Sequence, residues 1–198
     1  MKLAVIDYHA GNLTSVLKGL RAAGGDPFVT RAAADLDSAA GIVVPGVGHF
    51  GATRAIDAPM RAAITGAVDA GRPVLGVCLG LQFLFEGSDE APDLPGLGVL
   101  PGRCTLLPGG DLKVPHVGWN TIERRRDSRL LDGVGDEAYV YFTHSYAAPA
   151  GDACVASTTY GETFGAVVER GGVFGVQFHP EKSGEDGLRI LRNFVALC

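Results

Sequence analysis

The sequence lacks the features that mark membrane, secreted and nucleic-acid-binding proteins. No apolar run reaches the roughly 20 residues that cross a bilayer, and the stretch before Asp7 is too short and too acidic at its end for a signal peptide. The largest basic cluster is the arginine triplet 124–126, which we expect to form a solvated turn. Together with a net charge of −5, this argues against nucleic acid or a membrane as a partner and favours a cytoplasmic protein.

Cysteine is scarce, and its spacing excludes two of its common uses. The four cysteines show no CxxC motif and no paired spacing, so neither a zinc site nor a disulfide framework is predicted. We therefore expect no metal and no cofactor. Cys104, Cys154 and Cys198 are interpreted as structural or incidental, which leaves one cysteine to explain.

Strand and helix patterns alternate through the first half of the chain. Apolar runs at 3–6, 28–29, 42–44 and 73–77 predict strands, and helical spacing at 13–20 and 52–70 (interrupted at Pro59) predicts the intervening helices. This alternation indicates a parallel sheet covered on both faces. A final helix is predicted at 185–197. Between the two regions, short β-rich runs predict antiparallel hairpins at 97–100, 114–119, 139–146, 154–159, 164–168 and 173–178. The fold class is thus α/β, with residues 1–198 as a single domain.

The most informative stretch runs from Val74 to Gln82. Its apolar residues end at Cys78, with Gly76 and Gly80 two residues away on either side, and helical spacing follows at once. This is the layout of a nucleophile elbow, in which a strained turn between a strand and a helix carries the nucleophile. The helix N-terminus beside the sulfur would favour a thiolate. The alternative is a buried core cysteine next to a tight turn.

A thiol nucleophile needs a base, and only His179 among the five histidines has suitable neighbours. Pro180 pushes the residue before it into extended geometry, where Glu181 projects to the same side as the imidazole. Glu181 could then fix the tautomer of His179 while the other ring nitrogen faces Cys78, as in a catalytic triad. A chance turn sequence is the alternative. A metal site is disfavoured because a His-x-Glu pair supplies only two ligands.

Acyl transfer also needs donors for the developing oxyanion. We expect one from the backbone N–H of Leu79 and a second from the loop containing Gly46, Val47 and Gly48, because consecutive parallel strands end at the same edge of a sheet. The same loop begins a GxGxxG pattern at 46–51. Dinucleotide binding is disfavoured, because the pattern follows a later strand and no acidic residue ends a strand about 20 residues further on.

Two motifs resemble the signatures of class I glutamine amidotransferases: Gly-Val-Cys-Leu-Gly-Leu-Gln at 76–82 and His-Pro-Glu at 179–181. The stretches 45–51, 113–120, 141–146 and 177–183 are similar to the glutaminase subunits of imidazole glycerol phosphate synthase, from histidine biosynthesis. The resemblance covers the whole chain. Leu81 and Val117 depart from it where methionine is commoner, and both changes nearly conserve volume. The implied fold is a three-layer, open, mixed sheet with a flavodoxin-like parallel core and an antiparallel extension.

The resemblance implies that L-glutamine is the substrate. Cys78 would attack the carboxamide, His179 would protonate the departing ammonia, and water would then hydrolyse a γ-glutamyl thioester. By resemblance, the glutamine pocket is formed by Gly46, Gln82, Glu90, Ser145 and Tyr146. Each has a plainer interpretation; Glu90 could be a solvated loop residue and Tyr146 a half-buried strand aromatic.

Ammonia must reach an acceptor, and the resemblance implies a separate (β/α)8-barrel cyclase subunit in a heterodimer. Because the glutaminase module uses all 198 residues, we expect no acceptor domain in this chain. By resemblance, the interface contains Asn12, Trp119, Tyr141 and Lys182. The two glycines of the oxyanion loop suggest a hypothesis: its peptide points the wrong way at rest and turns when the synthase is loaded.

Two other classes of function stay open. A glutaminase serving another acceptor (anthranilate, aminodeoxychorismate or pyridoxal phosphate synthesis) would share the elbow and the triad but not the motif around Trp119. The same class includes a stand-alone cysteine hydrolase of this fold, which would work without a partner. A non-catalytic binding module is disfavoured because all three triad residues are present.

Overall fold

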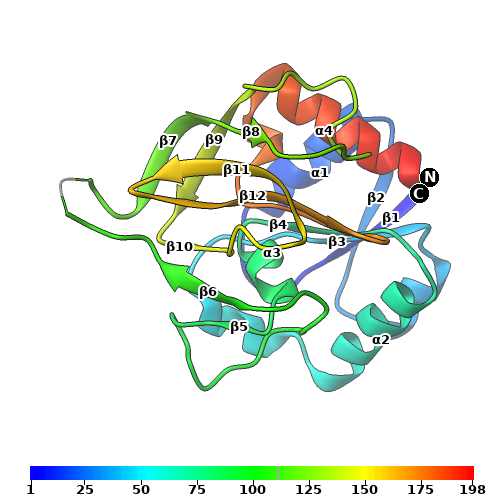
Figure 1. Cartoon of the computed structure of the whole chain (residues 1–198). Coiled ribbons are helices and arrows are strands. Elements are labelled where there is room, and N and C mark those ends of the chain that lie inside the picture. Colours follow the sequence, from blue (N-terminus) through cyan, green and yellow to red (C-terminus); the bar gives the residue numbers. More distant parts are fainter. Residues whose placement is uncertain (111) are drawn as a thin grey trace.

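The computed structural model describes residues 1–110 and 112–198 and is built around an eight-stranded sheet (Figure 1). Its strand order is β2-β1-β3-β4-β13-β12-β11-β8. The parallel half consists of β1 (Lys2–Ile6), β2 (Asp26–Thr30), β3 (Gly41–Val44), β4 (Val74–Val77) and β13 (Val173–Val176). The antiparallel extension consists of β12 (Glu162–Arg170), β11 (Cys154–Tyr160) and β8 (Glu123–Arg124). The predicted mixed sheet is confirmed.

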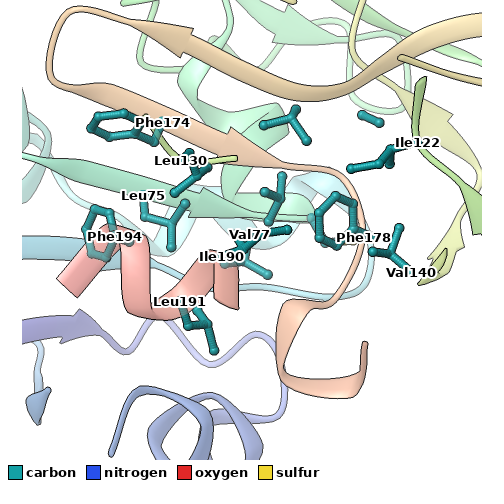
Figure 2. Packing of buried hydrophobic residues seen from close by; sticks show 14 of the residues in the cluster. Leu75, Val77, Ile122, Leu130, Val140, Phe174, Phe178, Ile190, Leu191 and Phe194 are labelled. Atoms are coloured by element: carbon teal, nitrogen blue, oxygen red, sulfur yellow. The ribbon is translucent and has the colours of Figure 1, made fainter. Parts of the chain in front are cut away.

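Helices cover both faces of the sheet, so the protein has three layers. In Figure 1, α1 (Leu13–Ala22) and α4 (Gly184–Leu197) lie above the sheet, and α2 (Ala58–Asp69) and α3 (Leu79–Leu84) lie below it. Successive residues of β1, β3, β4 and β13 belong alternately to two hydrophobic clusters, one on each face of the sheet. In the cluster on the face covered by α1 and α4, Ile190 and Phe194 of α4 pack near Leu75 of β4 (Figure 2). Burial of both faces explains why these strands read as continuous apolar runs.

Two small sheets and three short 3-10 segments complete the fold. One sheet is an antiparallel pair of β7 (His116–Thr121) and β9 (Tyr139–His144), and the other has the order β10-β6-β5. The remaining segments are β5 (Gly87–Ser88), β6 (Arg103–Leu106), β10 (Tyr146–Ala147), η1 (Ala33–Ser38), η2 (Phe50–Ala55) and η3 (Pro180–Lys182). None of the helices within the described ranges is long and apolar enough to span a bilayer.

Three local predictions were wrong, two because a tertiary contact decides the structure and one because of the position of a proline in its helix. The run 97–100 forms no strand; instead, Leu97 and Leu100 donate backbone hydrogen bonds to the carbonyls of Phe83 and Leu84 at the end of α3. Pro59 does not interrupt a helix. It lies in the first turn of α2, where its missing N–H leaves no hydrogen bond unmade.

The arginine triplet is also not a simple solvated turn. Arg124 belongs to β8, its Nε lies 3.0 Å from a carboxylate oxygen of Asp136, and it donates hydrogen bonds to the carbonyls of Leu131 and Val134. A charged run in the sequence therefore contributes one side chain that anchors the loop after β8.

Glycines let β4, α3 and β3 approach one another closely around the elbow. A Cβ placed on Gly80 would lie 1.7 Å from the carbonyl oxygen of Val44, and one on Gly76 would lie 2.6 Å from the carbonyl oxygen of Gly80. Backbone atoms at such short distances leave no room for a side chain at either glycine. The position of Cys78 therefore depends on the absence of side chains at both glycines.

Replacing Gly80 with alanine tests this close packing. Gly80→Ala should lower the free energy of unfolding by about 3 kcal/mol or more, because the new methyl group meets backbone that cannot rotate away. Gly66→Ala is the matched control: Gly66 lies in α2, and beyond the backbone of its own helical turns an added Cβ would meet no described atom within 4 Å. It should gain roughly 0.5–1 kcal/mol. Urea unfolding of both variants measures the difference, and equal effects would contradict the packing argument.

Candidate active site

Cys78 occupies the turn between β4 and α3 in a strained backbone conformation. Its φ is +52° and its ψ is −106°, a region that residues with a side chain seldom adopt. Two backbone hydrogen bonds hold it there: its N–H donates to the carbonyl of Val176 at 2.8 Å, and its carbonyl accepts from Gln82 at 3.1 Å. The thiol is thus presented on a fixed turn at the carboxyl edge of the sheet.

His179 reaches the same edge because β13 pairs in parallel with β4. Val176 lies opposite Val77 in the register, so the chain leaves the two neighbouring strands side by side. The Nδ1 atom of His179 lies 2.9 Å from Oε1 of Glu181, and the side chains of this pair are only 5% and 2% exposed. The ion pair is therefore almost fully shielded from water.

The protonation of His179 follows from its two partners. Burial lowers the pKa of the imidazole, but the hydrogen bond to Glu181 and the charges of Cys78 and Glu181 outweigh burial and raise the pKa to about 9. Because the value lies above neutrality, the imidazole holds its proton at pH 7. A protonated imidazole at this edge can supply a proton to a leaving group.

The loop after β3 lies against the elbow. The backbone N–H of Leu79 donates to the carbonyl of Gly46 at 3.4 Å, so the donor predicted for an oxyanion already faces a carbonyl of this loop. Further along, the N–H of Phe50 donates to Oε2 of Glu90 at 2.6 Å. Glu90 therefore anchors the far end of the oxyanion loop, a contact that the sequence did not suggest.

A cavity of about 200 Å³ opens in front of the sulfur. It is lined by most of the residues predicted for an oxyanion hole and a glutamine pocket, namely Val47, Gly48, Leu79, Gln82, Glu90, Ser145 and Tyr146. Gly46 lies behind this lining rather than in it. Within the wall, Nε2 of Gln82 donates to the carbonyl of Tyr146 at 2.8 Å. The cavity is thus walled largely by amide, hydroxyl and carboxylate groups, which suit a polar amide substrate.

Sequence reasoning missed two groups that contact the sulfur. Nε2 of Gln177 lies 3.7 Å from Sγ of Cys78, and the carbonyl oxygen of Thr143 lies 3.8 Å from it. Gln177 is fully buried just after an apolar strand, and this placement was the one available signal. Thr143 acts through its backbone, which no side-chain motif reveals.

Three of the four residues predicted at a partner interface lie together on the surface. Trp119 and Tyr141 are directly opposite in β7 and β9, with ring centroids 6.1 Å apart, and Nζ of Lys182 lies 5.5 Å from the Tyr141 ring centroid. The Trp119 residue is 55% exposed. Asn12 has a different local role, since its side chain accepts a hydrogen bond from the N–H of Ser15 at the start of α1.

Comparison with known proteins identifies the class of protein to which this fold and elbow belong. The family described as glutamine amidotransferase class-I matches residues 4–198, so the chain belongs to it. A solved structure of a glutamine amidotransferase superimposes with a TM-score of 0.77 over 98% of this chain and 97% of its own, at 20% identity, which supports the fold.

Curated relatives identify the family within this class to which the chain belongs. The imidazole glycerol phosphate synthase subunit HisH of Halobacterium salinarum is 50% identical, covering 99% of this chain and 93% of its own length. The HisH subunit of Methanothermobacter thermautotrophicus is 46% identical over 98% of both chains. Within the class I glutamine amidotransferases, this chain is therefore a member of the HisH family.

Removing the negative charge of Glu181 tests the raised pKa of His179. Glu181→Gln should lower that pKa from about 9, because one of the groups that stabilise the imidazolium is neutralised. The alkaline limb of kcat/KM for glutamine should then move to lower pH, and kcat should fall roughly 10²–10⁴-fold. Glu169→Gln is the control, since that carboxylate pairs with Arg129 instead. An alkaline limb that stays in place in Glu181→Gln would contradict the assignment.

Proposed function

We propose that this chain hydrolyses glutamine with Cys78, His179 and Glu181 and passes the ammonia to a separate cyclase subunit of imidazole glycerol phosphate synthase. The observation that carries the proposal is the buried His179–Glu181 pair, which follows the strand paired with the one that leads into the strained elbow at Cys78. Membership of the HisH family supports this acceptor over those of the other glutamine-dependent synthases. A single domain over residues 1–198 and a cytoplasmic location stay predictions.

The reaction follows from the protonation states. The Cys78 thiolate attacks the carboxamide carbon, and the tetrahedral intermediate collapses when protonated His179 gives its proton to the nitrogen, which leaves as ammonia. The neutral imidazole then takes a proton from water, and the hydroxide attacks the γ-glutamyl thioester. Glutamate and the thiolate are released, and His179 is protonated again. Glutamine and water are thus converted to glutamate and ammonia.

The cavity supplies groups for each end of the substrate. Glu90 uses Oε2 to hold the N–H of Phe50, which leaves its other oxygen for the α-ammonium group of glutamine. Gln82 is fixed by its hydrogen bond to Tyr146, so the wall that faces the substrate is set before binding. Ser145, between β9 and β10, and Tyr146, the first residue of β10, contribute backbone groups.

The outer face of the β7–β9 sheet supports a docking site for the cyclase. Val117, Trp119 and Tyr139 on this face are 56%, 55% and 61% exposed, although they are large apolar residues. Thr143, opposite Val117 in the register, also lines the cavity at Cys78. A partner seated on this apolar face would therefore adjoin the site where ammonia is released.

The oxyanion loop provides a switch in this proposal. At rest the N–H of Leu79 is directed at the Gly46 carbonyl, so this donor is not available to an oxyanion. Binding of the cyclase with its nucleotide ligand would favour a second arrangement of the loop. In it the Gly46–Val47 peptide has turned, and Leu79 and Val47 both direct their N–H groups at the oxyanion. Glutamine hydrolysis would then wait for the acceptor.

Substituting the nucleophile separates the two half-reactions. Cys78→Ala should abolish glutamine-dependent synthesis in the complex with the cyclase, while synthesis from added ammonium continues, because only the thioester step is lost. Cys198→Ala, at the end of α4, should retain both activities. Product formation from each nitrogen source gives the answer. Loss of both activities in Cys78→Ala would instead assign Cys78 a structural role.

Truncation of the exposed tryptophan tests the docking face. Trp119→Ala should weaken binding of the cyclase by about 2 kcal/mol, or about 30-fold in Kd, as expected for an anchor residue at the centre of an interface. Val29→Ala is the control: Val29 is 43% exposed on β2, an edge strand of the eight-stranded sheet, and so lies outside the β7–β9 sheet. Titration calorimetry with the cyclase compares them. If the two variants bind equally well, the cyclase docks elsewhere.

A further inference from the structure

Tyr8 carries a buried hydroxyl that the resting structure leaves unused. The residue follows β1 and is only 2% exposed, and its Oη has no hydrogen-bond partner within residues 1–110 and 112–198. A buried tyrosine normally finds a partner for this group, since an unmade hydrogen bond costs free energy. Burial, and next the charge of Cys78, raise the pKa of the phenol, so Tyr8 stays a neutral donor.

This hydroxyl is directed at the oxyanion loop. A Cβ built on Gly46 would lie only 2.1 Å from Oη of Tyr8. From the same connection between β1 and α1, a Cβ on Gly11 would lie 3.1 Å from Cα of Gly46 and 3.3 Å from the nitrogen of Val47. The segment from Tyr8 to Gly11 thus forms a wall beside the Gly46–Val47 peptide, on which Tyr8 provides a hydrogen-bond donor.

The orientation of that peptide decides whether Tyr8 has a partner. At rest the Gly46 carbonyl accepts from Leu79, on the side of the nucleophile. Because a trans peptide is planar, its carbonyl and its N–H point in opposite directions, so the N–H of Val47 points away from Leu79. Turning this one peptide moves the N–H of Val47 toward the nucleophile and the Gly46 carbonyl toward the wall. Glycine at 46 permits the rotation.

We propose that Tyr8 is a positioning residue, whose hydroxyl donates a hydrogen bond to the Gly46 carbonyl once the Gly46–Val47 peptide has turned. The inference rests on the loop switch of the proposed function and names the group that stabilises its active arrangement. A contact made in only one of two conformations shifts the equilibrium toward that conformation. The unpaired hydroxyl of the resting loop becomes paired in the active loop, which makes rotation of the peptide easier.

The backbone beside Tyr8 is itself constrained. His9 has a φ of +65°, and its N–H donates to Oδ1 of Asp7 at 3.0 Å, while Arg31 donates to the other oxygen of that carboxylate. Strained residues persist where the surroundings hold them, and they cluster at functional sites. The turn after β1 therefore fixes the position of the phenol, and Gly46, which has no side chain, is the mobile partner.

Removal of the hydroxyl alone tests the proposal. Glutamine turnover is measured for the wild type and Tyr8→Phe, each free and in complex with the cyclase and its nucleotide ligand, together with the Tm of the free chains. Tyr8→Phe should lower the kcat of the activated complex about tenfold with KM unchanged, because the oxyanion contact exists only in the transition state. The turnover of the free chain should stay the same. Its Tm should rise by roughly 2–4 °C, because an unpaired buried hydroxyl is removed.

Tyr160→Phe is the matched control, since the Tyr160 hydroxyl already donates to the carbonyl of Lys113 at 2.7 Å. It should lower the Tm and leave activation intact. Unchanged activation in Tyr8→Phe, an equal loss in the free and activated states, or a lower Tm of that variant would each overturn the role of Tyr8. A wild type that the loaded cyclase does not activate would remove the switch itself, and the proposal would fall with it.

Discussion

The parallel pairing of β4 with β13 is the constraint on which the site depends. These strands are about a hundred residues apart in the sequence, yet Val77 and Val176 lie opposite each other in the sheet, and the N–H of Cys78 donates to the carbonyl of Val176. One hydrogen-bonded ladder thus places the nucleophile and its base on neighbouring strand ends. If the register slipped by one residue, the side chains of β13 would exchange faces and His179 would leave the sulfur.

The free energy that holds this geometry comes from the packing around it rather than from the site. The elbow has a positive φ at Cys78, an unfavourable conformation that persists because Gly76 and Gly80 let β3, β4 and α3 close around it. The hydrophobic clusters on both faces of the sheet then fix the helices, as Figure 2 shows for α4. A rigid sheet edge with a strained nucleophile is suited to catalysis, because the reacting groups need no reorganisation.

The oxyanion loop is the part of the site with freedom to move. Its Gly46 carbonyl accepts from the N–H of Leu79, and the hydroxyl of Tyr8 lies beside Gly46 with no partner among the described residues. Glu90 holds the far end of the loop through the N–H of Phe50. In the proposed function, a change confined to one peptide separates the chemistry of the predicted triad from its timing.

Much of the fold was determined by the sequence alone, and so was the triad prediction, because both depend on local patterns. Periodicity located the parallel strands and the long helices, and the glycines around Cys78 and the proline after His179 indicated an elbow and an extended pair. Apolar spacing reports burial and not the partner, so the run 97–100 resembled a strand although it packs on the end of α3. The tertiary structure alone decided that Gln177 contacts the sulfur, that Leu79 already has an acceptor, and that the hydroxyl of Tyr8 faces Gly46. Each of these is a hydrogen-bonding relation between distant segments, and such relations depend on how the sheet is assembled.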